Sequence, residues 1–210
     1  MSDIKEINIM LGGETPEFEK IRNKKNWIAV DSGLEYLIEN KINPIFVCGD
    51  FDSFKKSRIN YDYQFIKKDN QDMTDAEFCL NITIRKFLNL KKINIYGATG
   101  RRLDHFLANI LLISNDLYRG IDISIVDNYN IIKFSEEGKN IIKYNKYYKY
   151  ISFVPFFDDT IVSIYNAKYN ANLLKLTKNR ANATSNEFIE KKDIILETNN
   201  RCLIIYSKDN

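Results

Sequence analysis

The sequence Val-Cys-Gly-Asp-Phe-Asp-Ser at residues 47–53 ends a short apolar run with two carboxylates spaced one residue apart. Residues 45–47 are apolar without polar alternation, which predicts a strand buried on both faces. Gly49 allows the backbone to bend, so that Asp50 and Asp52 can point to the same side of a turn. Two such oxygen ligands suit Mg²⁺ better than a softer metal. Asp and Ser also stabilise ordinary turns, so the stretch alone fits a structural turn as well.

Strand and helix patterns alternate over the first 127 residues. The predicted strands lie at residues 6–11, 27–30, 45–47, 63–66, 93–96 and 121–126. This alternation predicts a mostly parallel sheet covered on both faces, in which ligands bind beyond the carboxyl ends of the strands. The residues that fall at these strand ends are Asp31, Asp50, Gly97 and Asp127. The sequence therefore predicts three acids and a glycine turn at one edge of the sheet.

Two predicted helices begin next to this edge. Thr74 or Asp72 caps the first of them, and Asp75 lies in its first turn, beside the positive end of the helix dipole. Residues 97–102 lead into the second helix, predicted from about residue 103 to 117, whose free N–H groups favour an anion. Acids, a glycine turn and an arginine together suggest a polyphosphate held by Mg²⁺ and arginine.

Known nucleotide-binding signatures do not explain this arrangement. The Walker signature is missing, and Gly97-Ala98-Thr99-Gly100 has the wrong spacing for the dinucleotide fingerprint. A nucleotide would therefore be bound mainly through metal and side chains. Asp104 and His105 suggest acid–base chemistry, but a histidine in the first turn of a helix is more often structural.

From about residue 129 the pattern changes to short β-rich runs. These runs lie at residues 130–134, 141–144, 150–154, 161–165, 194–196 and 202–206. They predict an all-β second domain, so that the domains are residues 1–128 and 129–210. Residues 198–201 predict a hairpin turn between the last two strands.

Composition narrows the class of protein. Thirty-one basic and 28 acidic residues leave a net charge of +3, and the lysines are scattered, so no nucleic-acid partner is expected. The sequence has no apolar run of transmembrane length and no signal peptide, which predicts a cytoplasmic protein without a membrane partner. Its three cysteines, Cys48, Cys79 and Cys202, are far apart among apolar neighbours, which indicates reduced core residues.

Three motifs resemble, in order and approximate spacing, those of the thiamine pyrophosphokinase family. They are residues 49–53, residues 71–75, and residues 100–105 followed by Ala108 and Asn109. Residues 29–33 and 185–187 resemble two further segments of the family. The resemblance implies an α/β nucleotide-binding domain followed by a β-sandwich that binds thiamine. It also implies transfer of the pyrophosphoryl group from ATP to the hydroxyl of thiamine, with release of AMP, by a homodimer whose sites combine both subunits.

The resemblance also implies roles for individual residues. Mg²⁺ would be held by Asp50, Asp52 and Asp75. The rest of the catalytic set would be Asp72 and Asp104, which support the acidic cluster, and Arg102, which faces the phosphates. Substrate would be bound by Asp31, Gln71, Thr74, His105, Ser185 and Asn186, of which Gln71, Ser185 and Asn186 match positions that contact thiamine.

The sequence departs from the family pattern at two places. Arg101 stands where the family usually has a second glycine, and residues 166–169 lack a usual glycine. Two alternatives remain at this stage. One is a related pyrophosphokinase that acts on a pterin alcohol, and the other is a non-catalytic sensor of nucleotide or thiamine.

Overall fold

The computed structural model describes residues 3–50, 63–69, 71–100, 102–180 and 182–209. The chain combines helices with a large sheet and a second, antiparallel sheet, which confirms the predicted mixed α/β class. It divides into two compact units, Met1–Asn128 and Tyr129–Asn210.

The strands of the first unit pair in the order β6-β5-β1-β2-β3-β4, and every pair among them is parallel. In chain order the elements are β1 (Glu6–Met10), α1 (Phe18–Ile21), β2 (Trp27–Val30), α2 (Gly33–Glu39), β3 (Val47–Gly49), β4 (Phe65–Lys67), α3 (Asp75–Lys86), β5 (Lys92–Tyr96), α4 (Leu103–Ile113), a 3₁₀ helix η2 (Asp116–Tyr118) and β6 (Asp122–Val126). Parallel strands end at the same edge, so the loops after β1, β2, β3 and β5 meet there.

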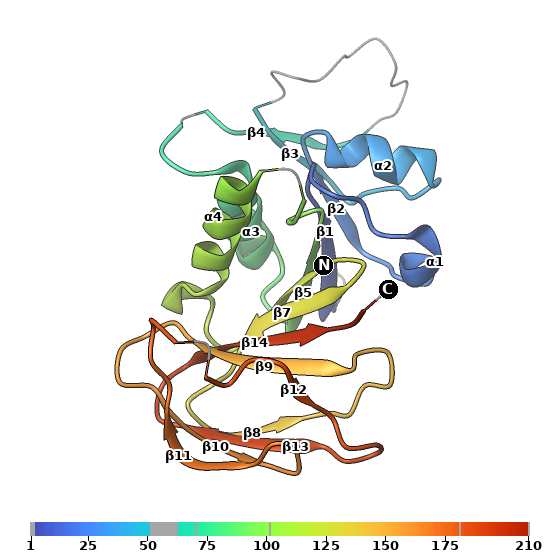
Figure 1. Ribbon diagram of the computed structural model, residues 1–210. Helices are drawn as coiled ribbons and strands as arrows, with labels where there is room; N and C mark the ends of the chain where they lie inside the picture. The colour runs from blue at the N-terminus through green and yellow to red at the C-terminus, as the bar shows by residue number, and fades with distance from the viewer. Residues whose placement is uncertain (1–2, 51–62, 70, 101, 181, 210) are drawn as a thin grey trace. The chain divides into compact units, whose positions relative to one another are not determined.

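Helices cover both faces of these strands. Leu34 and Leu37 of α2 pack against Trp27 and Ala29 of β2, whereas α3 buries Cys79 and Leu80. Figure 1 shows α2 and α3 on opposite sides of β2 and β3. Successive side chains of a strand point to opposite faces of the sheet. A continuous apolar run such as residues 27–30 is therefore buried on both faces.

Two sequence predictions for this unit need correction. The third strand begins at Val47 rather than at residue 45, and the side chain of Ile45 is 39% exposed, so this run is not buried on both faces throughout. The helix predicted to reach residue 117 ends at Ile113. The side chain of Asn115 accepts a hydrogen bond from the backbone N–H of Leu117 at 3.0 Å, which starts the separate 3₁₀ turn η2.

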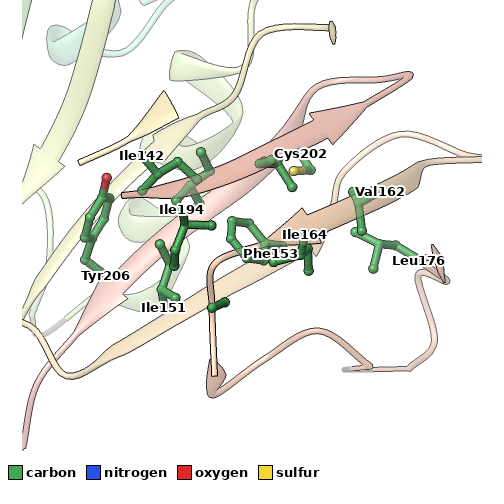
Figure 2. Close-up of a cluster of buried hydrophobic side chains, with 12 residues drawn as sticks. Ile142, Ile151, Phe153, Val162, Ile164, Leu176, Ile194, Cys202 and Tyr206 are labelled. Atoms are coloured by element: carbon green, nitrogen blue, oxygen red, sulfur yellow. The ribbon is translucent and has the colours of Figure 1, made fainter. Parts of the chain in front are cut away.

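The second unit is built from strands that form two antiparallel sets, β12-β9-β14-β7 and β11-β10-β13-β8. The strands are β7 (Asn130–Phe134), β8 (Gly138–Ile142), β9 (Tyr150–Pro155), β10 (Ile161–Tyr165), β11 (Ala171–Lys175), β12 (Asn186–Glu187), β13 (Ile194–Thr198) and β14 (Cys202–Ser207). Their apolar side chains form one core, in which Phe153 and Cys202 from the first set lie beside Val162 and Ile164 from the second (Figure 2).

The predicted hairpin at residues 198–201 is wrong. Strand β13 pairs with β10 and β8, whereas β14 pairs with β7 and β9, so this segment connects the two sheets. The hydroxyl of Thr198 donates to the carbonyl of Asn200 at 2.6 Å, and the side chain of Asn199 accepts from the N–H of Ile161 at 2.6 Å. These contacts stabilise the connection between a strand of one sheet and a strand of the other.

The cysteine prediction is confirmed, because Cys48, Cys79 and Cys202 are all buried and free. Burial raises the pKa of the Cys202 thiol to about 11 and raises the pKa of the Cys79 thiol well above its ordinary value. Within the described ranges, none of the helices has the length and apolar character that crossing a membrane requires.

Candidate active site

A pocket of about 730 Å³ lies in the first unit, where the loops after β1, β2, β4 and β5 meet the starts of α3 and α4. Its walls are formed mainly by residues 11–13, 30–32, 71–77, 97–100 and 108–109, with Lys68, Arg102 and His105. The pocket therefore opens at the carboxyl ends of the parallel strands, where the sequence predicts it.

The loops after β1 and β5 form one wall because they bond directly to each other. The N–H of Gly13 donates to the carbonyl of Gly97 at 2.8 Å, and the N–H of Glu14 donates to the carbonyl of Thr99 at 2.8 Å. A side chain at Gly13 would overlap both of these carbonyls, so this approach requires glycine. The side chain of Asn109, from α4, donates to the carbonyl of Ala98 at 3.1 Å and fixes the loop to the helix.

Asp31 lies at the end of β2 in a left-handed conformation, with a φ of +47°. Few residues other than glycine adopt such a φ, although Asp is among those that do so more readily. Its carboxylate lies against the α-carbon of Gly49, the last residue of β3. The acid after β2 is therefore adjacent to the backbone that leads into Asp50.

Asp75 lies in the first turn of α3. The side chain of Thr74 accepts from the N–H of Glu77 at 3.1 Å, so Thr74 is the cap, as one of the two sequence alternatives predicted. The ammonium of Lys68 lies 2.8 Å from Oδ1 of Asp75 and donates to the carbonyl of Met73 at 3.0 Å. The side chain of Lys68 is only 3% exposed, so a buried cation neutralises this acid.

Arg102 and Asp104 form a bidentate pair at the mouth of the pocket, with distances of 3.1 and 2.5 Å. These hydrogen bonds lower the pKa of the Asp104 carboxyl to about 2 and raise the pKa of the Arg102 guanidinium. Both side chains are 64% exposed. Arg102 is therefore a permanent cation at the start of α4, where free N–H groups also favour an anion.

The pocket brings together many of the residues that the sequence singled out. Those that line it are Asp31, Gln71, Asp72, Thr74, Asp75, Arg102 and His105. Asp50 and Asp104 are near it in sequence but are not among the lining residues, and neither is Asp127, which the strand pattern predicted at the same edge. Asp52 lies outside the described residues, and over the part of the chain that is described no group of three or more His, Cys, Asp and Glu side chains is arranged to hold a metal.

Ser185 and Asn186 belong to the second unit. Asn186 is buried, and its side chain both accepts from the N–H of Tyr169 at 3.0 Å and donates to the carbonyl of Tyr169 at 2.7 Å. It also accepts from the N–H of Glu187 at 2.8 Å. The side-chain amide of Asn186 thus holds the loop before β11. The neighbouring residue Ser185 is exposed and has a φ of +56°.

The sequence analysis did not single out Lys68, and it gave no individual role to Ser32, whose hydroxyl packs against Gly12; both residues line the pocket. A lysine within a polar run has the same sequence signal whether it is solvated or buried. Only the approach of Asp75 and of the Met73 carbonyl distinguishes Lys68 from its neighbours.

Two family models match the chain. Residues 18–125 match the model described as thiamin pyrophosphokinase, catalytic domain, and residues 139–203 match thiamin pyrophosphokinase, vitamin B1 binding domain. The chain belongs to the thiamin pyrophosphokinase family. This confirms the resemblance that the three motifs indicated.

The chain is also similar in sequence and in structure to individual members of this family. The chain is 31% identical to thiamine pyrophosphokinase of Bacillus subtilis over 98% of its own length and 100% of the relative. A crystal structure of thiamine pyrophosphokinase from Bacillus subtilis matches with a TM-score of 0.87 at 29% identity, covering 98% of this chain and 100% of that one. A thiamin pyrophosphokinase structure from Geobacillus thermodenitrificans matches with a TM-score of 0.86 at 26% identity, covering 98% of each chain.

Proposed function

We propose that this protein transfers the pyrophosphoryl group of ATP to the hydroxyl of thiamine, giving thiamine diphosphate and AMP. Family membership over nearly the whole chain supports this assignment. The observation that carries it is the pocket in which two of the family motifs meet, residues 71–75 from the start of α3 and residues 100–105 from the start of α4. One motif supplies acids and the other supplies a cation and helix N–H groups.

The acids fit Mg²⁺. Asp31, Asp72 and Asp75 are among the residues that line one pocket, and Asp50 follows Gly49, against which Asp31 lies. Mg²⁺ takes hard oxygen ligands and is commonly bound by one or two carboxylates together with substrate phosphates, so a complete protein cage is not required. We propose that Asp50, Asp52 and Asp75 hold the ion. When bound, it neutralises the polyphosphate and polarises the bond that breaks.

The chain's own residues then position and stabilise the reacting groups. Arg102 and the free N–H groups at the start of α4 bind the phosphate oxygens on which negative charge accumulates. The linked loops after β1 and β5 keep that wall rigid, because a shift of one loop would break the hydrogen bonds of Gly13 and Glu14. Alignment of the acceptor hydroxyl with the β-phosphorus, together with this electrostatic stabilisation, accounts for most of the catalysis that such transfers need.

The second unit is the proposed thiamine-binding domain, a β-sandwich that follows an N-terminal nucleotide-binding domain of mostly parallel strands. Asn186 would act there by holding the backbone of Tyr169, and Ser185 and Gln71 would contact the vitamin. The homodimer with sites shared between subunits and the cytoplasmic location remain predictions from the resemblance and the sequence.

A steady-state assay of AMP formation tests the proposal. The purified chain is supplied with ATP and Mg²⁺, and with thiamine, a pterin alcohol or no acceptor. AMP formed stoichiometrically with thiamine diphosphate, and only when thiamine is present, is the expected result. AMP formed only with the pterin alcohol would favour the related pyrophosphokinase, and nucleotide binding without AMP would favour a sensor.

A further inference from the structure

Lys68 connects the end of β3 with two residues that line the pocket. Its backbone N–H donates to the carbonyl of Gly49 at 3.0 Å, at the end of β3. Its ammonium reaches the carbonyl of Met73 at 3.0 Å and the carboxylate of Asp75 at 2.8 Å. The side chain of Lys68 thus holds the segment before α3, in which Gln71, Asp72 and Met73 line the pocket.

The buried ammonium of Lys68 restricts which carboxylate oxygen of Asp75 can bind a ligand. A charge removed from water is costly unless it is paired and hydrogen-bonded, and Lys68 has both kinds of partner. The pair therefore fixes Oδ1 of Asp75 and leaves its other carboxylate oxygen to meet a ligand. The neutral pair also attracts a free divalent cation less strongly than a lone carboxylate would, because the fixed ammonium repels it.

We propose that Lys68 is a positioning residue of the transfer site. It fixes the Asp75 carboxylate and the backbone at Met73, and its charge makes productive metal binding depend on the nucleotide. The proposal rests on the proposed function, because it assigns Asp75 to the metal that accompanies ATP. Lys68 acts through Asp75 and is not assigned a contact with the reacting atoms or the acceptor.

Three variants distinguish a role of Lys68 in positioning Asp75 from a role in stabilising the fold alone. Lys68→Met removes the charge and the hydrogen bonds, whereas Lys68→Gln removes the charge but keeps a donor. The double variant with Lys68→Met and Asp75→Asn leaves neither charge unpaired. Lys67→Met is the matched control, because Lys67 is the adjacent lysine, is exposed and does not line the pocket.

The measurements are thermal unfolding, binding of Mn²⁺ without nucleotide by electron paramagnetic resonance, and kcat and KM for ATP. We expect Lys68→Met to lower Tm, to bind Mn²⁺ several-fold more tightly and to lose at least tenfold in kcat. Lys68→Gln should show the same tighter Mn²⁺ binding with a smaller loss of Tm. The double variant should recover Tm without recovering kcat.

The outcomes distinguish this proposal from the assigned reaction. Unchanged Mn²⁺ affinity and kcat in both single variants would overturn the role of Lys68. If Lys68→Met does not fold, the Mn²⁺ affinity and kcat of Lys68→Gln alone test the role of Lys68. Absence of AMP formation by the unmodified chain and by Lys67→Met would instead contradict the proposed function, while Mn²⁺ binding and Tm would still report on Lys68.

Discussion

The carboxylate of Asp31 packs against the α-carbon of Gly49, and a methyl group at residue 49 would overlap Oδ1 of Asp31. Gly49 also has a φ of +147°, which side-chain-bearing residues rarely adopt. Two neighbouring strands of the parallel sheet therefore place an acid and a bare backbone in contact at the edge of the pocket. The first prediction follows from this contact.

Gly49→Ala should displace Asp31 and disturb the backbone that leads into Asp50. We expect a loss of about 1–3 kcal/mol of unfolding free energy from backbone strain, and weaker ATP binding. Thermal melts and ATP titrations measure the two effects. Gly120→Ala is the control, since Gly120 has a φ of +85° but nothing lies within 4 Å of an added methyl group. ATP affinity that falls equally in both variants would contradict a specific role of the contact.

Asp75→Asn and Asp50→Asn should each lower kcat/KM by about a hundredfold, or ~2.7 kcal/mol of transition-state stabilisation. The reason is that an amide is a poorer ligand for Mg²⁺ than a carboxylate. Asp75→Asn also leaves Lys68 without its anionic partner, so Tm should fall in that variant. Asp116→Asn, in the 3₁₀ turn η2 away from the pocket, is the control. A folded Asp50→Asn or Asp75→Asn protein with near-normal activity would show that the metal assignment is wrong.

The pair of Arg102 and Asp104 leads to a prediction about pH. Because the folded-state pKa of Asp104 is lowered from 3.8 to about 2, any stabilisation from the pair is fully present above pH 4 and is lost as the pH falls through 2. The Asp104 carboxyl should therefore show no titration between pH 4 and 9 in a carbon-13 NMR experiment. The Arg102→Met substitution should return the pKa of Asp104 toward 3.8 and should raise KM for ATP. An Asp104 titration near pH 4 in the unmodified protein would contradict the pair in solution.

Asn186→Ala should loosen the loop that begins at Tyr169. The N–H and carbonyl of Tyr169 would lose their partner, which costs on the order of 2 kcal/mol of unfolding free energy. We expect KM for thiamine to rise while KM for ATP is unchanged, because the pocket proposed to bind ATP lies in the first unit. Asn172→Ala, an exposed amide on β11, serves for comparison. Equal changes in both KM values would count against a separate acceptor domain.

Much of this account could be predicted from the sequence. The apolar runs that end in Asp31 and Asp50 predicted strands with acids at one edge, because burial and periodicity leave a local signal. The motifs at residues 71–75 and 100–105 predicted residues that meet in the pocket. Family resemblance added the reaction, which no local pattern contains.

Other features depend on partners that lie far away in the sequence. Residues 198–201 fit a hairpin turn, and only the pairing of β13 and β14 with different sheets shows that they connect the two sheets. Strand β12, with the sequence Asn-Glu, is too short to show a period. Lys68 resembles any solvated lysine until Asp75 and the carbonyl of Met73 enclose its ammonium.

The most direct test follows the fate of ATP when thiamine and Mg²⁺ are varied independently. We expect one AMP and one thiamine diphosphate for each ATP consumed, no AMP when either thiamine or Mg²⁺ is left out, and no phosphorylated protein at any stage. ADP as the product, or AMP formed at the same rate without thiamine, would contradict pyrophosphoryl transfer at this pocket.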